Sequence, residues 1–259
     1  MAPHGDGDGW VACACGRRHW GRFGAAGLLL AAQGKILLQH RASWSHEGGT
    51  WGVPGGARNR PESALAAALR EAVEETGLDV TLVRPSAELL VDHGTWSYTT
   101  VVASAAEALA VSPQDAESEE LRWVARADVV RLALHPGFAA SWPLLSDAIG
   151  LRLTLVIDGA NVVGSRPDGW WRDRAGAASR LRAALASLSS APLPDSALPA
   201  ELPRPRLSAW YAEPVLVVEG AARALAEPEL AQAQPARPER AVRVVPAAGS
   251  GDDALVRVV

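Results

Sequence analysis

Hydrophobic and polar positions along the first half of the chain predict short strands around one central helix. Residues 27–39 have the pattern of a hairpin, with "LLLAA", a turn at "QGK" and then "ILLQH". A helix is expected between Pro61 and Gly77, and "LDVTLV", "WSYTTVVASA" and "ELRWVA" are further β-rich runs. "HPGFAASWPLLSDAIG" is typical of a closing helix. This mixture predicts an α+β domain over residues 23–149.

The pattern changes at Leu151. "LRLTLVIDGANVVG" contains a continuous apolar run that ends in an acidic residue, as expected of a strand buried on both faces of a parallel sheet. "PVLVVEG" and "AVRVVPAAGSGDD" predict two more strands, and "SSAPLPDSALPAELPRPR" is too rich in proline to pack as a regular element. We therefore place a domain boundary near residue 150. Residues 150–259 are expected to form a smaller α/β domain with a parallel sheet and a Pro-rich surface insertion at about 189–207.

Composition indicates a cytoplasmic globular protein. Hydrophobic residues make up 48% of the chain and charged residues 21%, and the formal net charge of −4 implies no general attraction to nucleic acid or to acidic membranes. The two cysteines, Cys13 and Cys15, are too close in sequence to cross-link distant segments, which fits a reducing compartment. The start has no signal-peptide pattern, and the longest apolar run, residues 23–32, is about half of a membrane span. Residues 1–22 are expected to be an N-terminal extension.

The central helix carries an unusual concentration of negative charge. Since each helical residue turns about 100°, Glu71, Glu74 and Glu75 fall within an arc of roughly 100°. The opposite side is apolar and consists of Leu65, Leu69, Ala72 and Val73. A solvated charged face is the ordinary explanation, although like charges at this spacing repel. A bound cation is the alternative, because three carboxylates form the hard oxygen ligand set that Mg²⁺ or Mn²⁺ prefers.

The wider pattern around this helix resembles the signature of Nudix hydrolases. It runs from Gly56 over five residues to Glu62, then over seven residues to Arg70-Glu71, Glu74-Glu75 and Gly77-Leu78. Ala72 departs from the family, which normally has a bulkier aliphatic residue there. The resemblance covers roughly residues 23–149 and implies an α/β/α sandwich. It also implies Mg²⁺-dependent hydrolysis of a nucleoside diphosphate linked to another moiety, with Mn²⁺ as a second possible ion.

The resemblance further implies roles for individual residues. Glu74 and Glu75 correspond to metal ligands, and Glu71 to a ligand or the base, oriented by Arg70. The positions that brace this box are Gly55, Gly56, Glu62 and Gly77. The family often supplies one more Glu as base from a distant loop. The candidates in "AESEE" are Glu117, Glu119 and Glu120; we include Glu120 among the catalytic residues, although the sequence does not rank the three.

The choice of nucleotide stays open at this point. Arg41 in "LLQHRA" is a candidate for phosphate contact, but an exposed Arg without such a role explains it equally well. The aromatic residues available to stack on a base are Trp44, Trp51, Trp96 and Tyr98, and packing is the more common role of such residues. Oxidised guanine nucleotides, other nucleoside triphosphates and nucleotide sugars all remain compatible with the sequence.

Near the amino terminus, "CACGRRHW" contains three soft ligands. A structural zinc site normally takes four ligands with CxxC-type spacing, whereas Cys13, Cys15 and His19 are three, and the chain has no second cysteine pair. We therefore do not expect zinc here and interpret the cysteines as ordinary buried thiols.

In the second half, predicted strands run into acidic residues at Asp158, at Glu219 and at Asp252-Asp253. In a parallel sheet these carboxyl ends share one edge, where open α/β folds build their sites, although acidic residues also favour helix starts. "VIDGANVVG", "VVEG" and "GSGDDALV" resemble motifs of NYN domains, the PIN-like family of metal-dependent ribonucleases. The residues at the matching metal positions are Asp158, Asn161, Asp252 and Asp253, and Glu219 is less secure. The chain stops at "LVRVV" where that family continues, so the domain looks truncated.

Three functional hypotheses follow. The leading one is a Mg²⁺-dependent Nudix pyrophosphohydrolase that acts on a small-molecule nucleotide and is joined to a truncated PIN-like domain. The alternative is a metal-dependent ribonuclease in the second half with a regulatory Nudix domain, although charges in residues 151–259 nearly balance and indicate no basic stripe for RNA. A Nudix fold that senses nucleotides without catalysis is the third. The intact carboxylates argue against it, because a binding module has less need of crowded charge.

Overall fold

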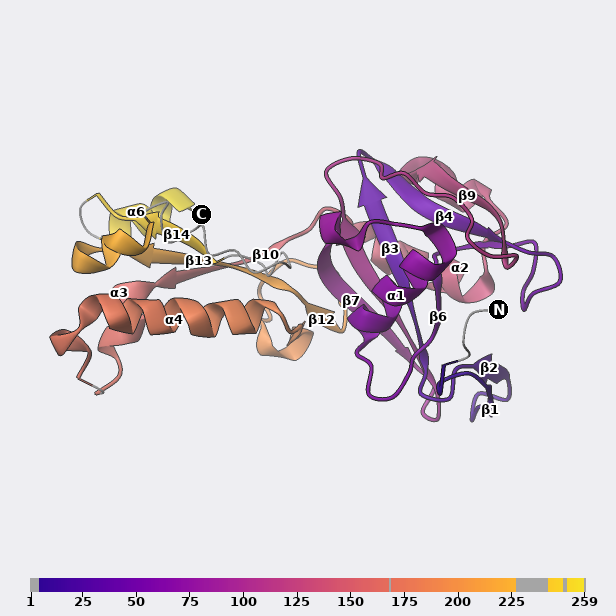
Figure 1. Ribbon diagram of the computed structural model, residues 1–259, viewed down its shortest axis with the longest axis horizontal. Coiled ribbons are helices and arrows are strands. Elements are labelled where there is room, and N and C mark those ends of the chain that lie inside the picture. Colours follow the sequence, from indigo (N-terminus) through magenta and orange to yellow (C-terminus); the bar gives the residue numbers. More distant parts are fainter. Residues whose placement is uncertain (1–4, 168, 227–241, 249–250, 259) are drawn as a thin grey trace. The chain divides into compact units, whose positions relative to one another are not determined.

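The computed structural model describes residues 5–167, 169–226, 242–248 and 251–258, with the side chains of 189, 252 and 258 excepted. The chain forms two compact units (Figure 1). The first comprises Met1–Leu151 together with Pro194–Trp210, and the second comprises Arg152–Leu193 together with Tyr211–Val259. Every helix in the described part falls short of the length and hydrophobicity that a membrane span requires.

The first unit is built on a mixed sheet flanked by helices. Its strands are β1 (Trp10–Ala12), β2 (Arg18–Trp20), β3 (Ala25–Ala32), β4 (Lys35–Arg41), β5 (Trp51–Gly52), β6 (Gly55–Ala57), β7 (Arg84–Asp92), β8 (Ser97–Ser104), β9 (Ser118–Ala125) and β12 (Ala209–Trp210), and β11 (Leu193–Pro194) lies at its border. Its helices are α1 (Ala64–Thr76) and α2 (Pro136–Ala148), with 3₁₀ turns η1 (Val80–Leu82), η2 (Arg126–Arg131) and η4 (Asp195–Ala197).

The strands of this unit follow the order β11-β12-β7-β8-β3-β4-β5, with β6 paired to β3 and β9 paired to β4. β3 and β8 run parallel, whereas the neighbouring β3–β4 and β7–β8 pairs are antiparallel. The predicted hairpin is confirmed: β3 and β4 join at Gln33 and Gly34, whose positive φ angles of 49° and 75° are those of a tight primed turn. β1 and β2 form a separate two-stranded sheet.

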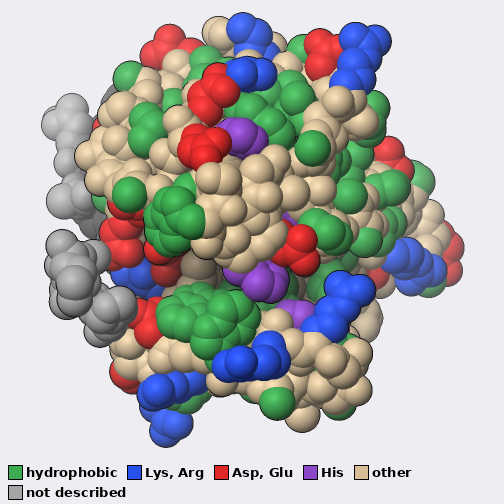
Figure 2. Space-filling model, turned by 90° about the vertical axis from the view of Figure 1, so that its right-hand side faces the viewer, with side chains coloured by type: hydrophobic (Ala, Val, Ile, Leu, Met, Phe, Trp, Pro, Cys, Tyr) green, Lys and Arg blue, Asp and Glu red, His purple; other side chains and the backbone are tan. Residues whose placement is uncertain are grey.

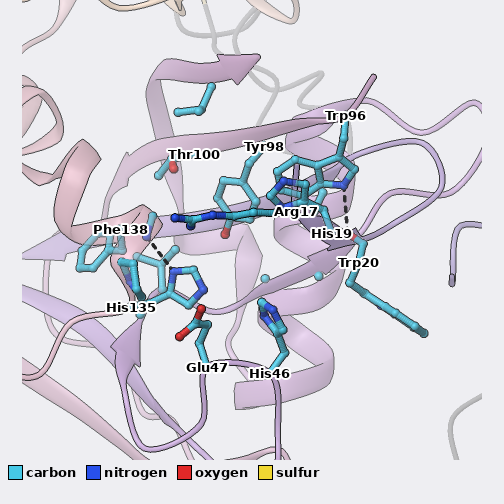
Figure 3. A pocket seen from close by; sticks show the side chains of 18 of the residues that line it. Arg17, His19, Trp20, His46, Glu47, Trp96, Tyr98, Thr100, His135 and Phe138 are labelled. Atoms are coloured by element: carbon cyan, nitrogen blue, oxygen red, sulfur yellow. Dashed lines mark hydrogen bonds between the residues drawn. The ribbon is translucent and has the colours of Figure 1, made fainter. Parts of the chain in front are cut away.

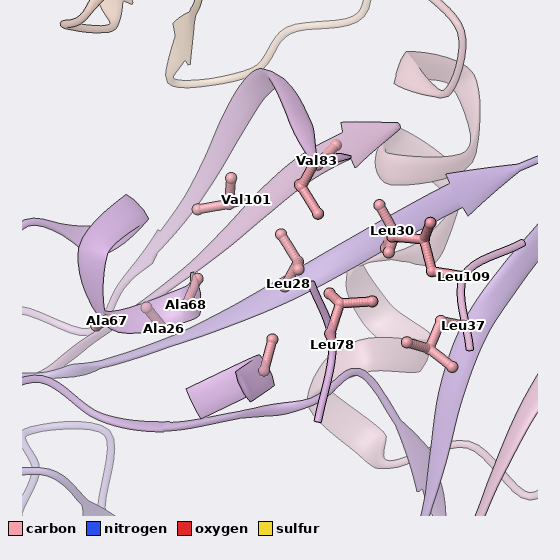
Figure 4. Packing of buried hydrophobic residues seen from close by; sticks show 12 residues of the cluster. Ala26, Leu28, Leu30, Leu37, Ala67, Ala68, Leu78, Val83, Val101 and Leu109 are labelled. Carbon is pink, nitrogen blue, oxygen red and sulfur yellow. The ribbon is translucent and has the colours of Figure 1, made fainter. Parts of the chain in front are cut away.

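Both faces of the central strand β3 are buried, which explains its unbroken apolar sequence. Ala26, Leu28 and Leu30 point toward α1 and pack with its alanines Ala67 and Ala68 (Figure 4). Leu29 points to the opposite face by alternation and is also fully buried. With α1 in front of the sheet and α2 behind it, the unit has the expected α/β/α layers (Figure 1).

Helix α1 begins and ends as its sequence signals indicate, with one shift. Ser63 is its N-cap, and its hydroxyl accepts a hydrogen bond from Ala66 N at 3.1 Å, so Pro61 lies ahead of the first turn. Gly77 ends the helix in the left-handed conformation at φ 67°, as predicted. The predicted apolar back is confirmed for Leu65, Leu69 and Ala72, which belong to the core cluster or pack against it. Ala67 and Ala68 add to it, whereas Val73 is 40% exposed.

The Pro-rich stretch lies with the first unit, not within the second as an insertion. Arg204 donates from Nε and Nη2 to the Asp195 carboxylate at 2.7 and 3.1 Å, and both side chains are largely buried. Trp210 Nε1 donates to the same carboxylate at 2.9 Å, and β12 pairs with β7. Side-chain hydrogen bonds therefore order residues 194–210, where proline prevents a regular backbone ladder.

The second unit is a small α/β structure. Its strands are β10 (Leu153–Asp158), β13 (Ala212–Val218) and β14 (Arg243–Pro246), and its helical segments are α3 (Gly159–Gly164), η3 (Trp170–Arg172), α4 (Arg174–Ser189), η5 (Gly220–Ala226) and α6 (Gly251–Val258). β13 lies between β10 and β14, and both pairings are parallel, as the apolar runs predict. A likeness to PIN domains rests on the sequence motifs alone.

Candidate active site

The charged groups of the Nudix-like signature converge on one arginine. Arg70 on α1 donates from Nε and Nη2 to the two carboxylate oxygens of Glu62, both at 2.9 Å. Its Nη1 donates to Glu71 at 2.7 Å and to Glu74 at 3.1 Å. These hydrogen bonds raise the pKa of Arg70 and lower that of Glu62, whose largest cause is Arg70. One permanent cation thus holds three carboxylates in place.

Glu75 lies one helical turn after Glu71, on the same side of α1, and is buried. It is 5% exposed, and its Oε2 accepts a hydrogen bond from Gly55 N at 2.8 Å. Burial raises the pKa of Glu75 to about 8 and that of Glu71 to about 7. Neighbouring negative charges add to both shifts. Glu71 helps to raise the pKa of Glu75, and Glu74 helps to raise the pKa of Glu71. The site is short of positive charge.

Two glycines allow the close approach of the backbone to these carboxylates. A Cβ on Gly56 would meet the Glu71 carboxyl group at 2.6 Å, and one on Gly55 would meet Ala26 O at 2.5 Å. At Gly55 the neighbour is the backbone of β3, so a side chain there would disturb the pairing of β6 with β3. At Gly56 the neighbour is the Glu71 carboxyl group, so a side chain there would displace that carboxylate.

The donor set fits a divalent cation of the magnesium type. Glu71, Glu74 and Glu75 offer carboxylate oxygens alone, which is the ligand class of Mg²⁺ and Mn²⁺. Beside them, the buried Gln39 donates from Nε2 to Ser118 at 2.6 Å, while its Oε1 has no hydrogen-bond partner among the described residues. Raised carboxyl pKa values and this unpartnered oxygen both indicate an electron-rich site that a cation stabilises.

The raised pKa of Glu75 predicts that the metal-free protein loses stability as the pH rises. The folded carboxyl keeps its proton up to about pH 8, whereas an ordinary Glu releases it near 4.5. Between these values the folded state binds more protons, so the free energy of unfolding falls with increasing pH. In EDTA we expect a lower Tm at about pH 8.5 than at about pH 6 by thermal denaturation.

Glu75→Gln is the matched control, because the amide keeps the shape and cannot ionise. Its metal-free Tm should fall less over the same pH range, and it should exceed that of wild type at the alkaline end. Identical pH profiles for the two proteins would contradict the burial of an ionisable Glu75.

The structure does not bring Glu120 to this cluster. The Glu120 carboxylate accepts hydrogen bonds from Nε and Nη2 of Arg122, at 2.8 and 2.7 Å. By alternation along β9, it lies on the face opposite Leu121, which packs toward α1. Glu119 pairs with His40 at 3.1 Å, and Glu117 is exposed. Of the acidic residues in this region, Asp115 contributes to the raised pKa of Glu75.

A cavity of about 710 Å³ opens beside the carboxylates, and Gly55 and Gly56 form part of its wall. On the face shown in Figure 2 the surface is hollowed, and histidine side chains are visible in the hollow between hydrophobic and cationic ones. Figure 3 shows its side chains from close by. Of the residues named from the sequence, Arg41, Trp96 and Tyr98 line it. Trp44 is 67% exposed, and Trp51 is buried between His40 and Arg122.

Much of the cavity wall comes from segments that the sequence analysis left without a role. The β1–β2 hairpin contributes Trp10, Arg17, Arg18, His19 and Trp20. The start of α2 contributes His135 and Phe138. His135 Nδ1 accepts a hydrogen bond from Gly137 N at 3.1 Å, and burial lowers its pKa, so the ring is neutral and its Nε2 carries the proton. That donor faces the cavity (Figure 3).

Comparisons with known proteins agree with this geometry. The family model of the NUDIX domain matches residues 21–147. A protein of Mycobacterium tuberculosis (strain H37Rv) with the name "Putative 8-oxo-dGTP diphosphatase 3" is 52% identical over 155 residues, which cover 56% of this chain and 71% of that protein. The chain belongs to the Nudix family.

Two further comparisons concern the activity and the fold of this Nudix hydrolase. A "Nucleoside triphosphate pyrophosphatase/Nudix hydrolase fusion protein" of Bifidobacterium longum is 46% identical over 149 residues, 54% of this chain and 31% of that protein. The crystal structure of a Nudix hydrolase from M. smegmatis, RenU, has 48% identity and a TM-score of 0.52, and covers 56% of this chain and 98% of that one. The chain is a pyrophosphohydrolase that acts on nucleoside triphosphates or diphosphate derivatives, and Nudix enzymes generally use a divalent metal such as Mg²⁺.

The second unit of this Nudix hydrolase does not show the predicted acidic cluster among its described side chains. Asp158 is the N-cap of α3, and its two oxygens accept hydrogen bonds from Asn161 N and Nδ2, both at 3.0 Å. Asp253 is exposed on α6, and the side chain of Asp252 lies outside the described residues. The capping role of Asp158 matches the ordinary explanation for an acid that follows a strand.

Sequence reasoning missed several residues around the active site. Asp115 and Asp8 raise the pKa values of Glu75 and Glu71, yet neither belongs to a recognisable motif. The hairpin at residues 10–20 falls within the expected N-terminal extension, yet it has five Trp, Arg and His residues in eleven positions. That density is the signal that could have indicated its place in the cavity wall.

Proposed function

We propose that this Nudix hydrolase cleaves an oxidised purine nucleoside triphosphate of the 8-oxo-dGTP class to the nucleoside monophosphate and pyrophosphate. The observation that carries the proposal is that the cavity wall adjoins the carboxylates of α1. The cavity wall at Gly55 and Gly56 lies directly against the Glu71 and Glu75 carboxylates, so a nucleotide whose base fills the cavity places its phosphates beside them. The name of the M. tuberculosis relative supports this substrate class.

The cavity suits a nucleotide in size and in chemistry. Its volume of about 710 Å³ lies in the range of small-molecule sites, and Arg17, Arg18 and Arg41 supply positive charge for phosphate oxygens. The aromatic rings of Trp96 and Tyr98 supply surfaces for a base. The Nε2 proton of His135 provides a donor for a base carbonyl, which an 8-oxopurine offers at two positions.

Within the hydrolytic site, the carboxylates of α1 have different proposed roles. Glu74 and Glu75 are the proposed metal ligands, and the bound ion would neutralise phosphate oxygens and acidify a water molecule. Glu71, which lies against Gly56 and is held by Arg70, is the proposed further ligand or proton acceptor, the two roles that the family resemblance implies. Arg70 positions Glu71 through the 2.7 Å hydrogen bond, and Glu62 positions Arg70. Asp115 replaces Glu120 as the candidate for an additional distal carboxylate.

A competition experiment tests the substrate class. Equal concentrations of 8-oxo-dGTP, dGTP, ADP-ribose and a nucleotide sugar are incubated with the full chain and Mg²⁺, and the products are separated by chromatography. We expect 8-oxo-dGTP to have the highest kcat/KM, with 8-oxo-dGMP and pyrophosphate as products. A preference for ADP-ribose or for the nucleotide sugar would exclude the proposed substrate class while leaving the pyrophosphohydrolase intact.

The proposed contact of His135 with the base predicts a selective effect of its substitution. In His135→Asn the amide oxygen can still accept from Gly137 N and cap α2, whereas the imidazole donor is lost. We expect kcat/KM for 8-oxo-dGTP to fall by about three- to tenfold, mainly through KM, as for one neutral hydrogen bond. His40→Asn, at a position that stacks on Trp51 outside the cavity wall, serves as the control and should change KM little. An unchanged KM in His135→Asn would remove this residue from base recognition.

A further inference from the structure

A second group of ligand-type side chains lies away from the carboxylates, at the end of the β1–β2 hairpin. The Sγ atoms of Cys13 and Cys15 and ring nitrogens of His19 and His93 all lie within 4.8 Å of one another. Three of the four come from the hairpin, and His93 comes from the turn between β7 and β8. The sequence motif offers three ligands, and the fold supplies a fourth, which lies 74 positions beyond His19.

We propose that Cys13, Cys15, His19 and His93 bind a structural Zn²⁺ ion. Two thiolates and two imidazoles are one of the standard tetrahedral zinc ligand sets, with Zn–S near 2.3 Å and Zn–N near 2.0–2.1 Å, so ligand atoms lie about 3.3–3.8 Å apart around the ion. The four ligand atoms lie within 4.8 Å of one another, roughly 1.0–1.5 Å more than those separations. Binding of the ion would therefore require the side chains to move closer by about this amount.

The hairpin turn is shaped so that both thiols face the same side. Cys13 N donates to Arg17 O at 2.9 Å, and Gly16 N donates to Cys13 O at 3.0 Å. Gly16 has a φ of 82°, a conformation that few other residues adopt. Cys15 Sγ lies 3.1 Å from His19 Nε2, so two proposed ligands are already in contact.

The opposite half of the site is held independently by the β7–β8 turn. His93 N donates to Trp96 O at 2.9 Å and closes this turn. The Cys13 thiol donates to His93 O at 3.6 Å, and Ala14 N donates to Thr95 Oγ1 at 3.2 Å. The ring of His19 stacks on Trp96 with centroids 4.1 Å apart and an interplanar angle of 10°. These contacts join the hairpin to the sheet at the proposed site, so the ligands are in place before the ion binds.

The hairpin needs such a link, because it has little core of its own. Isolated two-stranded sheets are marginally stable in water. Among residues 5–24, Cys13 is the single buried hydrophobic side chain. Trp10 and Trp20 are 44% and 40% exposed. A metal that joins residues 13–19 to residue 93 restrains the hairpin in the way that a long-range cross-link does.

The proposed ion has a functional consequence for the cavity. The hairpin that it anchors supplies Trp10, Arg17 and Arg18 to the cavity wall, and the ligands His19 and His93 are themselves lining residues. Figure 3 shows His19 beside Trp96, while the ring of Trp20 points away from the other labelled side chains. The zinc would therefore fix one wall of the nucleotide site. This inference depends on the cavity and not on the identity of the base.

The test uses the full chain and has two direct readouts. Zinc in protein purified without chelator is measured by elemental mass spectrometry, and the Co²⁺-substituted protein is examined for thiolate-to-cobalt charge-transfer absorption. The chain has two cysteines, both in this cluster, so that absorption reports on no other site. We expect one zinc per chain, a tetrahedral Co²⁺ spectrum and a lower Tm after zinc removal. A folded wild type that holds no zinc and gives no cobalt–sulfur absorption would overturn the proposal.

Variants separate this site from the catalytic one. His93→Asn and Cys15→Ser should weaken zinc binding by at least about tenfold, because loss of a ligand should cost no less than the roughly 10- to 100-fold found for the outer-shell partners of ligands, while His40→Asn should keep it. Glu75→Gln should retain a full complement of zinc although it loses Mg²⁺-dependent turnover. Retention of zinc and of the cobalt–sulfur absorption in His93→Asn would exclude the fourth ligand and with it the proposed site. Loss of zinc in Glu75→Gln would mean that the ion belongs to the carboxylates instead.

Discussion

Glu75→Gln is expected to lower kcat by on the order of 10³-fold, because a metal ion supplies several kcal/mol of charge stabilisation to phosphoanhydride cleavage. The amide keeps the volume of the buried side chain, but it removes the ligand charge at the centre of the site. Its oxygen can still accept the hydrogen bond that Gly55 N donates to Oε2 at 2.8 Å. Turnover of the preferred nucleotide at saturating Mg²⁺ measures the effect.

The control for this variant is Glu107→Gln, which makes the same chemical change at an exposed position. It should turn over at the wild-type rate. The combination of lost activity with a raised metal-free Tm at alkaline pH would identify Glu75 as a buried ligand rather than a structural residue. Activity in Glu75→Gln within a few fold of wild type would show that the ion, if required, is held elsewhere.

Arg70→Ala is expected to lower kcat/KM by about 10- to 100-fold, the range found for residues that orient a metal ligand. The substitution leaves Glu62 without its two 2.9 Å hydrogen bonds and releases Glu71 and Glu74 from Nη1. The fold should also lose stability, since partly buried carboxylates lose their paired cation. Arg70→Lys keeps the charge but lacks the planar guanidinium that contacts three carboxylates. We therefore expect an intermediate loss of kcat/KM.

Arg131→Ala provides the comparison for an ordinary surface ion pair. Arg131 is 78% exposed and pairs with Asp128 at 2.9 Å, an arrangement that contributes little to stability. Its activity and Tm should stay close to wild type. If Arg70→Ala behaved in the same way in steady-state kinetics and thermal denaturation, the carboxylates would not depend on Arg70 for their positions.

Local patterns in the sequence predicted the elements that depend on local chemistry. The turn at Gln33-Gly34 and the end of α1 at Gly77 each follow from a glycine, which adopts positive φ without strain, and strand β3 follows from its apolar run. The carboxylate cluster was predictable for the same reason, because helical spacing alone brings Glu71, Glu74 and Glu75 onto one side. The apolar back of α1 was predicted correctly for Leu65, Leu69 and Ala72. Ala67 and Ala68 were missed, because alanines carry a weak hydrophobic signal.

Features that depend on long-range packing could not be predicted from the sequence. The strand register turns Glu120 toward Arg122, and nothing in "AESEE" reveals that direction or the nearness of Asp115 to Glu75. His93 comes from a separate turn, so the four-ligand cluster exists only after the β1–β2 hairpin meets β7 and β8. The anchoring of residues 194–210 similarly depends on the pairing of Arg204 with Asp195 inside the first unit.

Hydrolysis by the wild-type chain, followed by chromatography with and without Mg²⁺, tests the central claim most directly. The claim is that the carboxylates of α1 hold a divalent ion that drives cleavage of a nucleoside triphosphate placed in the adjoining cavity. We expect nucleoside monophosphate and pyrophosphate as products with Mg²⁺, and no products in EDTA. A folded chain that leaves every nucleoside triphosphate and diphosphate derivative intact with Mg²⁺, or that cleaves them equally well in EDTA, would contradict it.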